Sequence, residues 1–142
     1  MRIEEEDSVL ELTATSDDSG DFLVSIEAQS EGFSGHADGH VVGAAWQSFV
    51  RELAALEEKR KGAARLVSAM PGEFDIEVKS IDSKGHMGAS GALSYRRAGV
   101  EQWPAQQLRF AFEFDPSKLS AFVVAAAGAQ QRAAGDVRNA RA

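Results

Sequence analysis

The segment Leu108–Leu119 has the sequence LRFAFEFDPSKL, and it is the clearest indication of the fold class in this chain. Its large apolar side chains recur at every second position, as in a half-buried strand: Leu108, Phe110, Phe112 and Phe114. Asp115 can accept amide hydrogens at the start of a following helix, and Pro116 suits the first helical position. The segment therefore predicts a strand that leads directly into a capped helix.

The same one-sided alternation predicts six further strands, over residues 9–16, 22–28, 33–42, 63–69, 73–79 and 86–96. Between the third and fourth of these strands the apolar period changes to that of a helix, with Trp46, Phe49, Val50, Leu53 and Leu56 on one face. Gly62 can end this helix. The glycines of the third and sixth strands lower their strand propensity and often mark bulges.

These elements predict an α+β fold in the order β-β-β-α-β-β-β-β-α. Short turns between strands require antiparallel pairing, and one apolar face per strand leaves one dry side for helices to cover. We expect a single antiparallel sheet of about six or seven strands with two helices packed on one face. Residues 1–130 form one domain in this interpretation. Residues 131–142 lack an apolar stripe, and we expect them to be a frayed or disordered tail.

The composition indicates a soluble protein, which we expect in the cytoplasm. The chain of 142 residues has no cysteine, so disulfides, thiolate metal sites and cysteine nucleophiles are excluded. Its start, Met1–Asp7, is acidic where a signal peptide would be basic and then apolar. The longest apolar run, Ala121–Ala127, is too short to span a bilayer.

Negative charge is concentrated in the first quarter of the chain. Residues 1–38 contain eleven acidic residues and Arg2 as their one basic residue, a net charge of −10 within an overall −7. Such a segment repels nucleic acid and membranes, and it would attract a basic protein. It would equally keep an exposed hairpin soluble. We therefore take as candidate partner-binding residues the acids around the first two turns: Asp17, Asp18, Asp21 and Glu31.

Trp103, beside Pro104 in a loop, is the fifth candidate for partner binding. Exposed aromatic side chains often anchor protein interfaces. Such a tryptophan can also fold back to cover the edge of a sheet.

Three groups of residues resemble chemical sites, and each also has a purely structural interpretation. His36, Asp38 and His40 would share one strand face and could offer two imidazoles and a carboxylate to zinc, or could simply be solvated. Glu73, Asp75 and Glu77 would also share a face, but an open sheet offers no pocket to separate their pKa values. The glycines of Gly85–Gly91 lack the lysine and helix of a phosphate loop, and Ser90 is not in a nucleophile elbow. We expect no catalytic residue, cofactor or metal.

Several spacings resemble a family of small bacterial immunity proteins, the WapI-type antitoxins and their uncharacterised relatives. The segments that carry this resemblance are Asp21–Val24, Gly32–Gly35, the helix positions Trp46, Phe49, Leu53 and Leu56, Gly62–Leu66, Gly85–Met87 and Leu108–Leu119. The resemblance implies a non-enzymatic protein that binds and blocks a co-encoded toxin, and it implies no active-site residues. The alternative that remains open is a small-ligand- or metal-binding domain. Neither the toxin nor the oligomeric state follows from the sequence.

Overall fold

The computed structural model describes residues 1–99, 102 and 104–140. The first half comprises β1 (Arg2–Glu5), β2 (Ser8–Ser16), β3 (Phe22–Ser30), β4 (Phe33–Val41) and α1 (Gly43–Lys59). The second half comprises β5 (Ala63–Val67), β6 (Phe74–Ser80), β7 (Met87–Tyr95), β8 (Gln106–Phe114), a short 3-10 turn (Pro116–Lys118) and α2 (Leu119–Ala140). Each half thus contains four strands followed by a helix.

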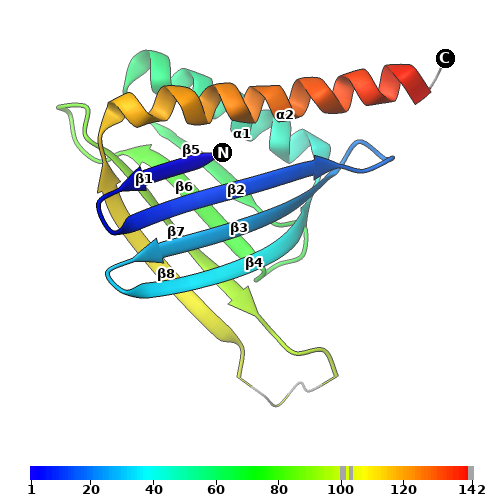
Figure 1. The fold of residues 1–142 in the computed structure, drawn as a ribbon, viewed down its shortest axis with the longest axis horizontal. Coiled ribbons are helices and arrows are strands. Elements are labelled where there is room, and N and C mark those ends of the chain that lie inside the picture. Colours follow the sequence, from blue (N-terminus) through cyan, green and yellow to red (C-terminus); the bar gives the residue numbers. More distant parts are fainter. Residues whose placement is uncertain (100–101, 103, 141–142) are drawn as a thin grey trace.

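The α+β class and the antiparallel pairing are confirmed, but the prediction of a single sheet is wrong. Within the described residues the strands form two four-stranded sheets: a first sheet in the order β1-β2-β3-β4 and a second sheet in the order β5-β6-β7-β8. The sheets face one another with their strands crossing, and both helices lie along one side of the pair (Figure 1). The apolar faces therefore cover each other, because α1 separates the two sets of strands and lets the second set stack on the first instead of extending it.

The helices close the side of the core that the sheets leave open. α1 follows the first sheet in the chain but packs mainly against β5 of the second sheet, and α2 follows the second sheet but contacts β1 and β2. The helices also contact each other. Trp46 of α1 is fully buried and stacks on Phe22 of β3, with ring centroids 5.0 Å apart. The two halves therefore interlock around one shared core.

The first strand, β1, was absent from the predicted order. It is only four residues long and has a single buried apolar residue, Ile3, which pairs with Leu10 of β2. One apolar residue among acidic neighbours gives no periodic signal. The 3-10 turn before α2 binds the next two residues of β1: Lys118 donates to the Glu4 carbonyl at 2.6 Å and pairs with Glu5 at 2.8 Å.

The capped start of the last helix is confirmed, and its end differs from the prediction. The Asp115 carboxylate accepts a hydrogen bond from the Ser117 amide at 2.9 Å, with Pro116 at the start of the turn. α2 then continues to Ala140, so residues 131–140, predicted to be frayed, are helical. Ala129 and Ala133, one turn apart, are buried against the core, and this stripe of small side chains is too weakly apolar to be read from composition.

The end of α1 lies slightly before the predicted glycine. Arg60, not Gly62, adopts the left-handed conformation there, and its amide donates to the Leu56 carbonyl at 2.9 Å. Among the described residues, neither helix has the length together with the apolar character that a membrane span requires.

Candidate protein-binding face

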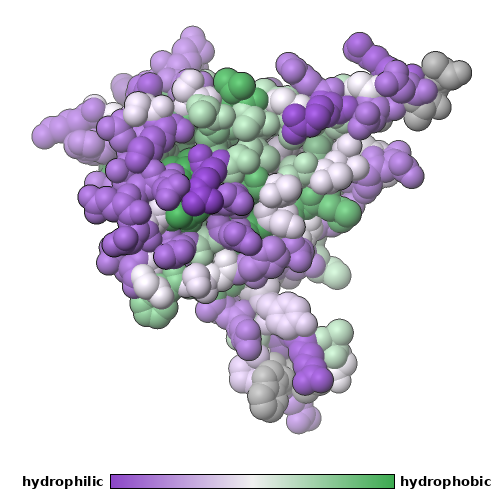
Figure 2. All heavy atoms as spheres, viewed as in Figure 1, coloured by the Kyte–Doolittle hydropathy of each residue, from purple (hydrophilic) through white to green (hydrophobic). Residues whose placement is uncertain are grey.

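The outer face of the first sheet carries His36, Asp38 and His40 and lies between the turns that carry the predicted acidic residues. Alternate residues of β1–β4 point away from the core there: Arg2, Glu4, Val9, Glu11, Thr13, Thr15, Leu23, Ser25, Glu27, Gln29, Ser34, His36, Asp38 and His40. Arg2 is the one arginine or lysine among them, against four carboxylates. Hydrophilic side chains are spread over this side of the molecule, interrupted by smaller apolar areas (Figure 2).

Ion pairs and hydrogen bonds cross this face from strand to strand. The Arg2 guanidinium contacts Glu11 at 2.6 Å and Glu4 at 3.0 Å, and these carboxylates raise its pKa. The Ser25 hydroxyl donates to Asp38 at 2.6 Å, and this bond, followed by the nearby His36, lowers the pKa of Asp38. Asp38 therefore remains ionised well below neutral pH. Because these side chains are largely exposed, water screens the pairs and they contribute little to stability.

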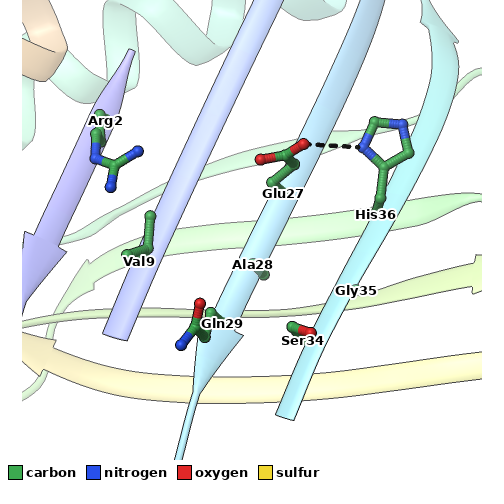
Figure 3. A pocket seen from close by; sticks show the side chains of 8 residues that line it. All are labelled: Arg2, Val9, Glu27, Ala28, Gln29, Ser34, Gly35 and His36. Carbon is green, nitrogen blue, oxygen red and sulfur yellow. Dashed lines mark ion pairs between the residues drawn. The ribbon is translucent and has the colours of Figure 1, made fainter. Parts of the chain in front are cut away.

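A shallow hollow of about 450 Å³ lies on this face, toward the turn between β3 and β4. Glu27 of β3 points toward His36 of β4, with 3.7 Å between the carboxylate and Nδ1 (Figure 3). The other side chains around this hollow are Arg2 of β1, Val9 of β2, Gln29 of β3 and Ser34 of β4. A broad, open and polar hollow of this kind can receive protruding side chains of another protein, whereas a small-molecule site is normally concave and mostly apolar.

The predicted acidic residues do not form one cluster. Asp17, Asp18 and Asp21 lie in the turn between β2 and β3, and Glu31 lies in the turn between β3 and β4. β3 separates these turns by its nine residues, which is about 30 Å at the rise of an extended strand. Trp103 lies outside the described residues. A partner that engaged both turns would have to cover the whole length of the outer face.

Asp17 and Asp21 make hydrogen bonds that stabilise the turn and the start of α1. One oxygen of Asp17 accepts bonds from the Ser19 amide at 2.8 Å, the Ser19 hydroxyl at 2.5 Å and the Asp21 amide at 3.1 Å. The Ser19 hydroxyl, followed by His40, holds the pKa of Asp17 far below its ordinary value. Asp21 accepts from the Gly43 amide at 2.8 Å, which caps the start of α1. Asp18 and Glu31 are exposed and remain available to a partner.

The predicted histidine triad does not converge on a single point. His36 Nε2 lies 2.9 Å from Asp38, whereas His40 Nε2 turns to Asp17 of the neighbouring turn, also at 2.9 Å. Within the described part of the chain, the group that could hold a metal is instead Asp17, Asp21 and His40, whose ligand atoms lie within 4.8 Å of one another. A metal there would have to replace the 2.9 Å contact between His40 Nε2 and Asp17 Oδ2.

Glu73, just before β6, and Asp75 and Glu77 of β6 do not act as a group of paired carboxylates. Asp75 forms an ion pair with Arg65 of β5, and Glu77 pairs with Lys79 at 3.2 Å. Glu73 differs from both, because its Oε2 is buried and has no hydrogen-bond partner. Sequence reasoning grouped Glu73 with a solvated strand face. The sequence carries no signal for this difference, because β4 covers Glu73 only in the folded chain: a Cβ at Gly39 would lie 2.6 Å from Glu73 Oε2.

Comparisons with known proteins place few constraints on this chain. No family model matches it, and no curated protein matches it. Among solved structures, a chain from crystal structures of trypanosome MRP1/MRP2 is similar, with 13% sequence identity over 82% of each chain and a TM-score of 0.40.

Proposed function

We propose that this protein is a non-enzymatic protein-binding module whose partner is basic. The observation that supports this proposal is the outer face of the first sheet, where four carboxylates and one arginine are presented on an open surface. Asp18 and Glu31 extend the negative charge to the two turns at its ends. Such a surface increases the association rate of a positively charged protein.

The resemblance to WapI-type immunity proteins suggests that this partner is a co-encoded toxin. A toxin that attacks nucleic acid must itself be basic where it binds phosphates, and an acidic sheet face is complementary to such a site. The direct test is to co-express the protein with the product of the adjacent gene in a bacterial host. Rescue of growth and co-purification of the two proteins would support the proposal, and independent toxicity with no complex would contradict it.

The charge mechanism has its own test with the purified pair. The triple variant D18K/E27K/E31K reverses exposed charges at both ends and in the middle of the outer face. It leaves Asp17 and Asp21, which hold the turn together, unchanged. We expect association to slow by about tenfold or more at low salt and the salt dependence to weaken. The matched control E58K/E113K/D136K reverses three exposed charges that lie outside this face. Equal rates for the three proteins would rule out steering by this face.

The alternative sequence-based hypothesis, a ligand- or metal-binding domain, would use Asp17, Asp21 and His40. A calorimetric titration with zinc discriminates the two. Stoichiometric binding that H40A abolishes would favour the metal hypothesis over the protein-binding one.

A further inference from the structure

β4 and β8, each nine residues long, form the two long strand edges of the described chain. The Ala111 carbonyl of β8 already accepts a hydrogen bond from the Ser30 hydroxyl of β3 at 3.4 Å, so we consider the edge formed by β4. β4 pairs with β3 along all nine of its residues and with no strand on its other side. It contains neither proline nor lysine, which natural edges commonly use to prevent further pairing. β1 and β5, the edges next to the helices, are only four and five residues long.

The register of the β3–β4 hairpin determines which backbone groups point outward. Its two-residue turn consists of Glu31 and Gly32, both with positive φ (50° and 82°). In such a hairpin the pair next to the turn, Ser30 and Phe33, exchanges hydrogen bonds, and then every second pair does so. The amides and carbonyls of Ser34, His36, Asp38 and His40 therefore point to the free edge. Of these four residues, His40 is engaged, because its carbonyl accepts from Ala69 at 2.7 Å.

A groove runs along this free edge. β7 and β8 extend past β4 on the side of its free edge (Figure 1). His36 and Asp38 of β4, the turn Met70–Glu73 and the hairpin residues Tyr95 and Gln107 line a groove of about 680 Å³. It continues toward Ser34 and Leu108 as a smaller groove of about 220 Å³. Met70 and Tyr95 are 63% and 64% exposed, which gives the groove an apolar rim.

The groove also contains an unsatisfied negative group. Glu73 lines it, and Glu73 Oε2 is buried with no hydrogen-bond partner. A carboxylate oxygen that is buried without a hydrogen-bond partner has lost its water without replacement, and a cation supplied by a ligand would offset that loss. Asp38 adds a second carboxylate, while Arg96 contributes a positive charge on the opposite side of the groove.

We propose that the groove binds an extended segment of the basic partner as a fifth strand of the first sheet, with a lysine or arginine of that segment reaching Glu73. Main-chain hydrogen bonds to Ser34, His36 and Asp38 would provide affinity, and Glu73 and the apolar rim would provide specificity. A second copy of this chain fits the groove less well. With a net charge of −7 it would bring a strongly acidic molecule against an acidic sheet. This inference rests on the proposed function.

The test begins with peptides selected for binding to the purified protein from a display library of random dodecapeptides. We expect enrichment of sequences with alternating β-branched or aromatic residues and at least one lysine or arginine. On binding, the amides of Ser34, His36 and Asp38 should become protected from hydrogen exchange, while the exchange of β1 amides should not change.

Two pairs of variants then separate the backbone and the charge contributions. H36P removes an outward amide that β3 does not use, whereas the control H36T loses the same imidazole but keeps the amide. We expect H36P to weaken peptide binding by about tenfold and H36T to bind normally. E73Q should weaken the binding of lysine-containing peptides by about tenfold. The control E77Q, on the outer face of the second sheet, should not change their binding. Because E73Q keeps the size and shape of the side chain, we expect the variant to fold as stably as the parent protein.

The outcomes distinguish this inference from the proposed function. If the selected peptides leave the β4 amides unprotected, they bind elsewhere. That result would rule out the groove as the binding site and would still agree with a protein-binding role. Enrichment of acidic peptides, or equal binding by H36P and H36T, would also overturn the proposed mode. Failure to select any binder would contradict both proposals. Sedimentation that shows a dimer dissociated by H36P would mean that a second copy occupies the edge.

Discussion

Single glycines of β4 allow the two sheets to approach each other. A Cβ at Gly39 would lie 2.5 Å from a ring carbon of Phe74, and one at Gly35 would lie 2.8 Å from Leu108 Cδ2. The sequence predicted that these glycines weaken the strand or mark a bulge. The structure shows another reason for them: the second sheet crosses at these two positions, and any side chain would force the sheets apart.

The substitution G39A tests this close contact. We expect destabilisation by about 1–3 kcal/mol, because the added methyl group meets Phe74 and the Glu73 carboxylate in a packed interface. G128A is the matched control, because its Cβ would meet only the end of Arg132 at 3.5 Å. Alanine in place of a helical glycine should stabilise the protein by about 0.5–1 kcal/mol. Urea denaturation measures both, and a stabilised G39A would contradict the close approach.

At the residue scale, His86 provides a test of the electrostatics. Its Nδ1 contacts the Asp82 carboxylate, and this bond raises the pKa of His86 above its ordinary 6.5 and lowers that of Asp82 below 3.8. The contribution of His86 to stability is present below pH 6.5 and is lost as the pH rises through its folded pKa. That of Asp82 is present above pH 3.8 and is lost as the pH falls through its folded pKa. The pair therefore stabilises the fold most between these two values.

A proton NMR titration of the His86 ring should show a midpoint above 6.5. In D82N the midpoint should fall toward the ordinary value, because the neutral amide no longer favours the imidazolium. As an internal control, D38N should leave the His86 midpoint unchanged. A His86 midpoint that is the same with and without Asp82 would contradict the contact.

At the element scale, the small side chains of α2 hold its last turns against the core. Ala133 is 8% exposed, whereas its neighbour Ala134 is exposed. We expect A133E to lower the free energy of unfolding by about 1–3 kcal/mol, because it places a charge against the core. The substitution A134E should change it by less than about 0.5 kcal/mol. Equal effects in urea denaturation would indicate that this end of α2 does not pack on the core.

The start of α2 offers a second prediction at the element scale. D115A removes the acceptor for the Ser117 amide, so we expect a lower melting temperature, by about 3 °C. D115N keeps an acceptor at the same position and should recover most of the loss. Circular dichroism at several scan rates measures both, and identical melting curves for D115A and the parent protein would show that the cap is not needed.

At the scale of the whole molecule, each half depends on the other for burial. α1 packs mainly on the second sheet and α2 on the first, although each helix follows the other sheet in the chain. A fragment of residues 1–61 would expose the inner face of the first sheet and the face of α1 that covers β5. We expect this fragment to be unfolded by circular dichroism and the full chain to unfold in one cooperative transition. Two separate transitions would contradict a shared core.

The sequence by itself determined the parts of this protein that have a strong local signal. The alternation of Leu108–Phe114, the cap at Asp115 and the stripe from Trp46 to Leu56 each depend on neighbours in the chain, so periodicity revealed them. β1, with Ile3 as its single buried residue, and the small-residue stripe of α2 had no comparable signal and were missed.

Only the tertiary structure decided how the elements combine. Whether eight strands form one sheet or two depends on contacts between residues far apart in the chain, such as Gly39 with Phe74, and these leave no period in the sequence. The same is true of the candidate sites. Tertiary packing turned His40 toward Asp17 and buried one oxygen of Glu73 beneath β4.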